Sequence, residues 1–256
     1  MKQKLLCLLL ATSTLCLLTA CGDKKQPDTT EANPGEAIVG EEIRTNNADI
    51  TEVNNELLAD AQAYILMDDA FTISGKGTII TGFCYNQPFP VDTEVDIFHP
   101  NQRVETTLTY VDDNGEELDE LPLGGSCGFM LDGIGKDGVG KYDLVVLKGE
   151  GVLTNKITGS FVISTFAAKE DIPSLVGSEV TMGYFSTFAN VTYDGVIDTV
   201  VGANGEDIND LNPGDVAIVT ITLNEEIPMV RGTEIFYQTA NGIADSAACI
   251  ASPVEE

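Results

Sequence analysis

Short hydrophobic segments rich in β-branched and aromatic residues follow one another from residue 63 to the end of the chain, and glycine, proline, asparagine and aspartate separate them. This pattern is typical of β-strands joined by turns, because β-branched and aromatic side chains fit a pleated sheet. The first series comprises AYILM, AFTIS, TIITGFCY, EVDIF, VETTLTYV, CGFML and DLVVLK, and the second comprises SFVISTF, EVTMGYF, NVTYDGVI, VAIVTITL, TEIFYQT and ADSAACIA.

The sequence KGEG at 148–151 separates the two series, and neither contains a long amphipathic helical pattern. We therefore expect an all-β protein with two consecutive antiparallel β-barrels, the first over residues 63–150 and the second over 151–256. Closed barrels are favoured because so many short strands in open sheets would leave unpaired edges.

The segment before the strands has a different composition. Residues 22–50 are rich in Asp, Glu, Pro, Thr, Asn and Gly with few large apolar side chains, which is typical of a disordered segment. Within residues 51–62, apolar side chains recur near helical spacing, so one or two helical turns are predicted there. Residues 21–62 are thus interpreted as an acidic, flexible tether with a short helix at its end.

Residues 1–20 have the pattern of an export signal. Lys2 and Lys4 precede an uncharged apolar stretch, which ends in the sequence LTAC. This stretch is short for a membrane-spanning helix and is typical of a signal peptide. The ending resembles a bacterial lipobox, which implies lipidation of Cys21 and cleavage before it. The expected location is then the bacterial cell envelope, with the protein anchored to a membrane and facing outside the cytoplasm. An ordinary secreted protein is the alternative.

The charge balance narrows the classes of partner. The 256 residues include 13 Lys and Arg against 41 Asp and Glu, a formal net charge of -28. Loss of residues 1–20 would remove two lysines and no acid, leaving -30. Such a chain is poorly suited to binding nucleic acid or an anionic membrane surface through charge, because both need clustered basic residues. The expected contact with the membrane is the lipid on Cys21.

The residues that often carry chemistry are few. Cys84, Cys127 and Cys249 remain after the signal, without a CxxC pair, and they lie in apolar runs. We predict buried thiols, with a Cys84–Cys127 disulfide as the alternative. His99, the single histidine, precedes a proline and has no pattern of catalytic partners. No catalytic residue, metal site or cofactor is predicted.

The acidic segment DDNGEE at 112–117 has two interpretations. A β-hairpin turn at Asn114 and Gly115 is favoured, because Asn-Gly is a strong signal for a two-residue turn. Calcium binding by the carboxylates is the alternative, although the segment lacks the spacing of an EF-hand.

Residues 68–82, DDAFTISGKGTIITG, resemble the opening of the second domain of elongation factor Tu-type translational GTPases. Stretches between 118 and 134 resemble later strands of that domain, and residues 211–250 resemble the closing half of the third domain. The resemblance covers about residues 63–252 and implies two antiparallel barrels packed together. No GxxxxGK[ST] phosphate loop occurs in the sequence, so GTP binding and hydrolysis are not expected.

In that family the second domain helps to hold the aminoacyl end of tRNA. The positions that match it here are Asp112, Leu118, Asp119 and Glu120, whereas Gly115 stands where the family has an arginine. Loss of basic side chains removes phosphate contacts, so tRNA binding is not expected.

The expected function is therefore a non-catalytic docking module on a membrane-anchored lipoprotein, with an envelope protein, a peptide or a glycan as its partner. One alternative is an elongation-factor-like protein that acts in translation and binds aminoacyl-tRNA. The other is an exported hydrolase that uses carboxylates, although 41 acidic residues give no basis for choosing a pair.

Overall fold

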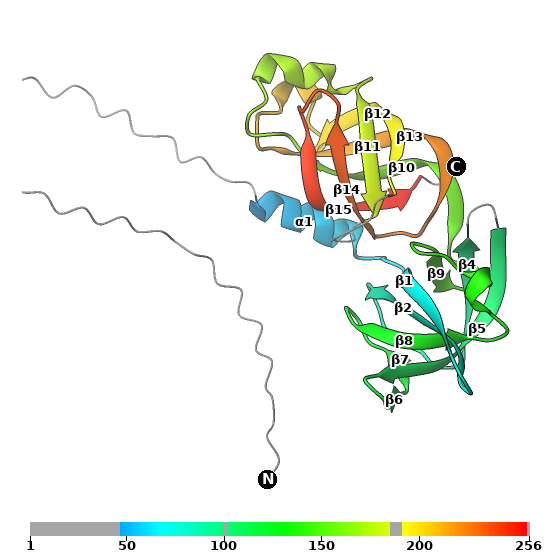
Figure 1. Cartoon of the computed structure of the whole chain (residues 1–256). Coiled ribbons are helices and arrows are strands. Elements are labelled where there is room, and N and C mark those ends of the chain that lie inside the picture. The colour runs from blue at the N-terminus through cyan, green and yellow to red at the C-terminus, as the bar shows by residue number, and fades with distance from the viewer. Residues whose placement is uncertain (1–46, 100–101, 185–190, 255–256) are drawn as a thin grey trace, which may run out of the picture. The chain divides into compact units, whose positions relative to one another are not determined.

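A computed structural model describes residues 47–99, 102–184 and 191–254, and within these ranges the chain is mostly β-structure (Figure 1). The expected fold is confirmed, since two closed six-stranded antiparallel barrels follow one another along the chain. The predicted signal peptide 1–20, the lipidation site Cys21 and the tether up to residue 46 lie outside the described residues.

The first barrel closes through strands that are distant in sequence. Its order is β4-β9-β1-β2-β8-β5, and pairing of β4 with β5 completes the ring. The short strand β6 extends β5, and β3 pairs with β7 beside the barrel. The elements are β1 (Tyr64–Ile73), β2 (Gly77–Tyr85), β3 (Phe89–Pro90), β4 (Thr93–His99), β5 (Gln102–Asp113), β6 (Glu116–Leu118), β7 (Glu120–Leu121), β8 (Ser126–Leu131), the 3-10 turn η1 (Lys136–Gly138) and β9 (Leu144–Leu147).

The second barrel has the order β10-β13-β12-β11-β14-β15, and β15 pairs back with β10. Its longest strand, β13, alternates buried and half-buried residues along most of its length, as expected for a barrel wall with one face in the core. The elements are β10 (Val152–Val162), η2 (Lys169–Leu175), β11 (Glu179–Tyr184), β12 (Tyr193–Gly202), η3 (Ile208–Asp210), β13 (Val216–Met229), β14 (Thr233–Thr239) and β15 (Asp245–Pro253).

Strand β1 contributes side chains to two hydrophobic clusters. Ile65 and Met67 point into the core of the first barrel, whereas Tyr64 and Leu66 belong to the cluster that forms the core of the second. All four side chains are therefore buried, although side chains alternate between the two faces of a strand. Side chains of the first barrel thus belong to the same cluster as the core of the second, which is consistent with the packed barrels that the resemblance implied.

The sequence pattern divided β1 into two strands, AYILM and AFTIS, but the structure has one continuous strand with a register shift between Met67 and Asp69. Such a bulge bends a strand and changes which side chains face the core. The residues up to Met67 are buried, whereas those after it alternate between half-buried and exposed, and the last three are all exposed. The apparent break in the pattern is therefore this bulge.

The helix predicted near residues 51–62 is α1 (Asn47–Leu57), which lies earlier in the chain than the pattern indicated. It contacts β10 and β15 of the second barrel. Val53 is buried, and Ser160 Oγ donates a hydrogen bond to Asn54 Oδ1 over 2.6 Å. These tertiary contacts stabilise a helix that would be marginal in isolation.

The prediction that the three cysteines after the signal are buried thiols is confirmed. Cys84 and Cys127 are buried thiols that are not joined to each other, and Cys249 is buried as well. The alternative of a Cys84–Cys127 disulfide is therefore wrong for this structure. Each thiol occupies a position in a barrel wall that a small apolar side chain would otherwise fill.

Candidate functional site

A shallow hollow of about 250 Å³ lies on the first barrel beside the β1–β2 hairpin. We call it the hairpin hollow. Strands β1, β2, β5 and β8 contribute to it, together with the turns after β1 and β5. Its lining residues are Phe71, Ile73, Lys76, Ile79, Thr81, Tyr110, Asp112, Asp113, Asn114, Ser126 and Gly128.

Local sequence explains why the hairpin reaches this place. Gly75 and Gly77 have positive φ angles of 82° and 119°, a conformation that glycine adopts at little cost, and Ile73 pairs with Gly77 across the turn. A side chain at Gly77 would also approach Met130 Cε to 2.9 Å. The two glycines therefore permit both the tight turn and the close approach of β8.

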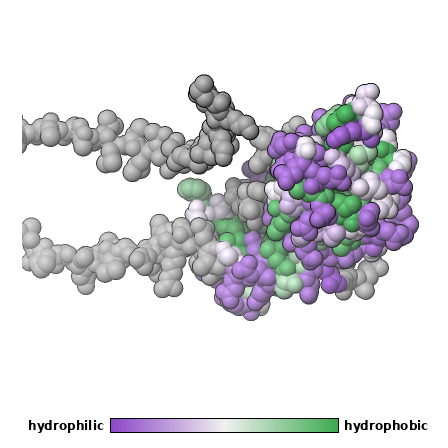
Figure 2. Space-filling model, turned by 90° about the horizontal axis from the view of Figure 1, so that it is seen from below, coloured by the Kyte–Doolittle hydropathy of each residue, from purple (hydrophilic) through white to green (hydrophobic). Residues whose placement is uncertain are grey.

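The apolar side of the hollow is formed by Phe71 and Ile73, which are 40% and 39% exposed. They lie two residues apart on β1, so their side chains project from the same face of the strand. Figure 2 shows hydrophilic residues over much of one face of the molecule, with separate hydrophobic areas among them. Neighbouring exposed apolar side chains in a hollow are more informative than scattered ones, because contiguous patches often mark binding surfaces.

The polar side of the hollow is a chain of hydrogen bonds. Lys76 Nζ donates to the Tyr110 hydroxyl oxygen over 3.3 Å, and this hydroxyl donates to Asp112 Oδ2 over 2.9 Å. The Gly115 amide donates to Asp112 Oδ1 over 3.0 Å. The hydrogen bond from the Gly115 amide makes the largest contribution to lowering the pKa of Asp112. The hydrogen bond from Tyr110 and the nearby charge of Lys76 lower it further. Asp112 is thus a fixed, ionised acceptor on a half-buried wall.

Lys76 supplies the positive charge of the hollow. Its hydrogen bond to Tyr110 and the nearby carboxylates of Asp112 and Glu117 raise its pKa. Its ammonium also lies 5.3 Å from the centroid of the Tyr110 ring. The hollow therefore presents an apolar wall beside an ordered row of one cation, one phenol and one carboxylate.

Of the four residues predicted from the family resemblance, only Asp112 lines the hairpin hollow. Leu118 lies in β6, opposite Val111. Asp119 follows it with an exposed side chain and accepts a hydrogen bond from Val91 N through its backbone carbonyl. Glu120 is exposed in β7 opposite Pro90. The structure therefore places these three residues along the outer strands β6 and β7.

Sequence reasoning missed Phe71, Ile73 and Tyr110 as site residues. All three lay in predicted strands, and a strand pattern does not distinguish a side chain that faces the core from one on the outside of a barrel. The available signal was the pair Phe71 and Ile73 close to the Gly75 turn, where a strand that leaves the core exposes both.

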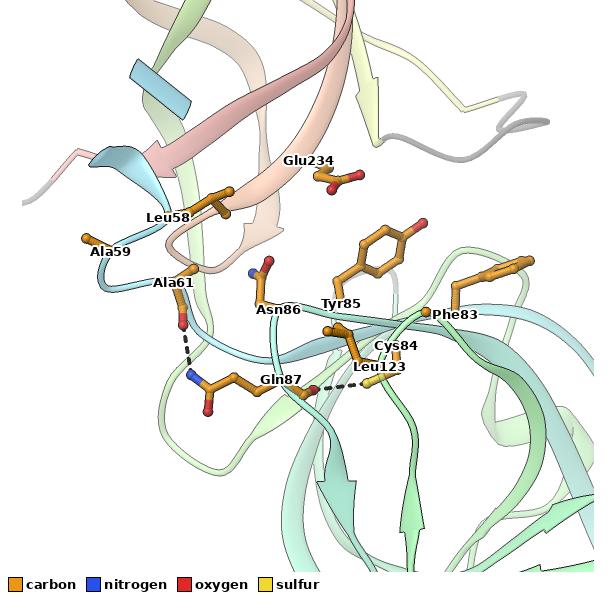
Figure 3. Close-up of a pocket in the computed structure, with 11 residues that line it drawn as sticks. Leu58, Ala59, Ala61, Phe83, Cys84, Tyr85, Asn86, Gln87, Leu123 and Glu234 are labelled. Carbon is orange, nitrogen blue, oxygen red and sulfur yellow. Dashed lines mark hydrogen bonds between the residues drawn. The ribbon is translucent and has the colours of Figure 1, made fainter. Parts of the chain in front are cut away.

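A larger pocket of about 530 Å³ lies elsewhere and contains Glu234 of β14 (Figure 3). We call it the Glu234 pocket. Its other walls come from the end of β2, the turn before β8 and the segment between α1 and β1. The lining residues are Leu58, Ala59, Ala61, Phe83, Cys84, Tyr85, Asn86, Gln87, Leu123, Gly124 and Glu234.

Groups with obvious catalytic chemistry are not concentrated in either place. Across residues 47–99, 102–184 and 191–254, no group of three or more His, Cys, Asp or Glu residues could hold a metal ion. Burial raises the pKa of Cys84 to about 12, so its thiol is protonated near neutral pH and is a poor nucleophile. The described helices include none that is long and apolar enough to cross a membrane.

Comparison with known proteins agrees with this architecture. No protein-family model matches the chain. Elongation factor Tu 2 of Streptomyces avermitilis is 26% identical over 178 residues, which cover 69% of this chain and 43% of the relative. The chain is therefore distantly similar to elongation factor Tu, and its two six-stranded barrels are consistent with the second and third domains of that protein. It matches less than half of the relative's length.

Proposed function

We propose that the protein is a lipid-anchored docking module of the bacterial cell envelope, which binds a partner through the hairpin hollow without catalysing a reaction. The carrying observation is the pair of exposed side chains Phe71 and Ile73 beside the ordered carboxylate of Asp112. An apolar wall next to a fixed polar group is a usual arrangement for recognition, because burial gives affinity and the polar group fixes orientation.

The partner best suited to this surface is a protein or peptide segment with an apolar side chain next to a basic one. The apolar side chain would pack on Phe71 and Ile73, and the basic one would approach Asp112. The net charge of -28 favours association with a basic segment over a longer range. A glycan could use the hydrogen-bonding groups, but it would leave much of the apolar wall unpaired.

The anchor is the second part of the proposal. The signal-like residues 1–20 and the Cys21 lipobox support lipidation and location outside the cytoplasm. Each methylene group of an acyl chain that enters the membrane contributes about 0.8 kcal/mol of binding free energy, and several chains together give stable attachment. GTP binding and hydrolysis are not part of the proposed function, since the chain contains no phosphate-loop motif.

Lipidation can be tested in cells fed an alkyne-labelled fatty acid. The wild-type chain and a Cys16→Ala control should incorporate the label and sediment with membranes, whereas Cys21→Ala should lose the label. Equal labelling of the Cys21→Ala chain would contradict the proposed anchor.

Docking can be tested with the full chain as bait on solubilised envelope of its own organism. The bound material is identified by mass spectrometry for wild type and for the double variant F71S/I73S. The matched control is Phe166→Ser, because Phe166 is 97% exposed but lies outside the hollow. A partner that is retained by wild type and the control but lost by the double variant is the expected result. Retention of the same material by all three would show that the hollow is not the docking surface.

A role in binding aminoacyl-tRNA is the second candidate, favoured by the similarity to elongation factor Tu 2 and by the position of Asp112. The same capture distinguishes it, because bound RNA is detected separately from protein. Specific retention of tRNA that depends on Phe71 and Ile73 would replace the envelope partner with this candidate.

A further inference from the structure

The Glu234 pocket is separate from the hairpin hollow, and none of the described residues lines both. Its volume of about 530 Å³ falls within the range of small-molecule sites, about 300–1,000 Å³. Figure 3 shows Leu58, Phe83 and Leu123 on different sides of the space, with the Tyr85 ring between them and Glu234 at the edge opposite Leu123. Two of the apolar side chains are strongly accessible, since Phe83 is 38% and Leu123 is 59% exposed.

Hydrogen bonds hold the polar rim in place. Asn86 has a positive φ of 66°, and its side-chain amide donates to the carbonyl oxygens of Gln62 and Gly232 over 2.8 and 3.1 Å. Gln87 Nε2 donates to the Ala61 carbonyl over 3.2 Å. The side-chain amides of the rim thus donate to the backbone of two segments, the one before β1 and the turn between β13 and β14, so the rim is largely preformed.

The aromatic wall is also fixed. The rings of Tyr64 and Tyr85 are stacked, with centroids 4.5 Å apart and an interplanar angle of 3°. The Glu234 backbone amide donates to the Tyr64 hydroxyl over 3.0 Å. This contact ties β14 to the stacked pair and sets Glu234 next to the Tyr85 ring, as Figure 3 shows.

Among the residues that the structure describes, Glu234 is the one acidic side chain that lines this pocket. It is half-buried, and within the described part of the chain its carboxylate takes part in no ion pair or hydrogen bond. Burial raises the pKa of Glu234. The pKa of Tyr85 is raised to about 12, mainly by burial of its own hydroxyl and secondly by the charge of Glu234. A carboxylate that loses hydration without gaining a partner is a site where a cationic ligand would recover electrostatic free energy.

We propose that the Glu234 pocket binds a small organic cation, an amine with an apolar body, whose ammonium pairs with Glu234 while its body packs on Tyr85, Phe83 and Leu123. The faces of Phe83 and Tyr85 would add attraction for such a cation. An inorganic cation fits less well, because one carboxylate and apolar walls cannot replace its hydration shell. This binding does not depend on the hairpin hollow or on lipidation.

The probe for the first test is 4-phenylbutylamine, with 4-phenylbutan-1-ol as its neutral analogue and 4-phenylbutyrate as its anionic analogue. Binding to the purified full chain is measured at neutral pH by calorimetry and by ligand-observed NMR. We expect the amine to bind about tenfold or more tightly than the alcohol, because the alcohol cannot form a charge-assisted hydrogen bond with Glu234. The carboxylate should bind most weakly, because its charge is repelled by that of Glu234. Equal affinity for the three probes, or no binding of the amine at millimolar concentration, would overturn the proposal.

Variants then locate the site. Glu234→Gln preserves shape and should remove the preference for amine over alcohol, whereas Glu226→Gln, an exposed acid of β13, should leave it unchanged. Leu123→Ser should weaken the binding of both the amine and the alcohol, since it removes part of the apolar wall. Because Leu123 is 59% exposed, this substitution does not disturb the core. F71S/I73S should bind the amine as wild type does, which separates this site from the docking surface. An unchanged preference in Glu234→Gln would place the amine elsewhere and refute the assignment.

Discussion

Arg103 Nη2 lies 2.6 Å from Asp96 Oδ2, although the Asp96 side chain is completely buried and that of Arg103 is 43% exposed. The Gly149 amide donates to the same carboxylate oxygen over 2.7 Å, whereas Asp96 Oδ1 has no hydrogen-bond partner among the described residues. Asp96 thus joins β4, the neighbouring β5 and the turn that leads from the first barrel to β10. Its side chain accepts hydrogen bonds from two donors, and the guanidinium of Arg103 reaches it from the surface.

Substitution of Arg103 by methionine should therefore destabilise the protein at neutral pH by about 1–3 kcal/mol, because a buried carboxylate would keep only the Gly149 amide. Denaturant unfolding measures the change. The double variant D96N/R103M should recover part of the loss, since the neutral amide does not need the missing charge. Equal losses in the single and double variants would show that the pair is not coupled.

Lys148 provides the matched comparison. It pairs with Glu94 over 3.3 Å and Glu105 over 3.2 Å, but all three side chains are exposed. Exposed ion pairs contribute about 0–1 kcal/mol, so Lys148→Met should cost clearly less than Arg103→Met in the same unfolding experiment. A cost as large as that of Arg103→Met would contradict the importance assigned to burial.

Glu234 should make the protein less stable as pH rises. Its pKa in the folded protein is raised by burial, so the unfolded chain loses its proton at lower pH than the folded one. The stabilisation is complete below the unfolded pKa, about 4.3, and is lost as pH rises through the folded value. Glu234→Gln should consequently raise the melting temperature at pH 7 relative to wild type, with a smaller difference near pH 4. A difference that is independent of pH would contradict this assignment.

The thiol of Cys84 should be inert in the native protein. Burial raises its pKa to about 12, and Cys84 Sγ donates to the Gln87 carbonyl over 3.0 Å. Because the thiolate is the reactive form, iodoacetamide at pH 8 should modify Cys84 only after denaturation. Peptide mass spectrometry identifies the modified site, and Leu123→Cys, at a 59% exposed position, should react in the native state. Rapid native labelling of Cys84 would show that the wall of the Glu234 pocket opens.

Gly232 should not tolerate alanine. Its φ of +78° is unfavourable for other residues, and an added Cβ would come within 2.4 Å of Ala61 Cβ. Backbone strain and overpacking together should cost about 2–4 kcal/mol. Gly242 is the control, because its φ is +68° and no atom of the described residues lies within 4 Å of the added Cβ. Gly242→Ala should therefore cost only the backbone strain, about 1–2 kcal/mol. Thermal unfolding of both variants measures the difference, and equal losses would show that the Ala61 contact is unimportant.

Turn chemistry accounts for much of what could be predicted of the fold. The expected turn at Asn114 and Gly115 is confirmed, with positive φ angles of 55° and 90°. The hairpin at Gly75 and Gly77 follows from the same local preference. Less could be predicted where distant segments impose a conformation, as in β1, whose bulge between Met67 and Asp69 resembled a gap between two strands.

The candidate sites were predicted only in part. Asp112 was identified through a resemblance, and its role as an ordered acceptor depends on Tyr110 and the Gly115 amide, which surround it in the folded barrel. Glu234 had no signal at all, because one acid among 41 is unremarkable until its neighbours are known. The same holds for Phe71 and Ile73, which are strand residues in sequence and surface residues in the fold.

The sequence by itself determined the class of structure, the two series of strands, the buried character of Cys84 and Cys127, and the resemblance to elongation factor Tu. These properties are local or statistical, since each depends on residue type and on spacing over a few positions. Only the tertiary structure decided that Tyr64 and Leu66 join the core of the second barrel and that α1 docks on β10 and β15. It also decided that Glu234 shares a pocket with Tyr85, where its carboxylate has no ion pair or hydrogen bond within the described part of the chain. Barrel closure brings residues far apart in sequence into contact, and the burial and electrostatic environment of a side chain arise from those contacts.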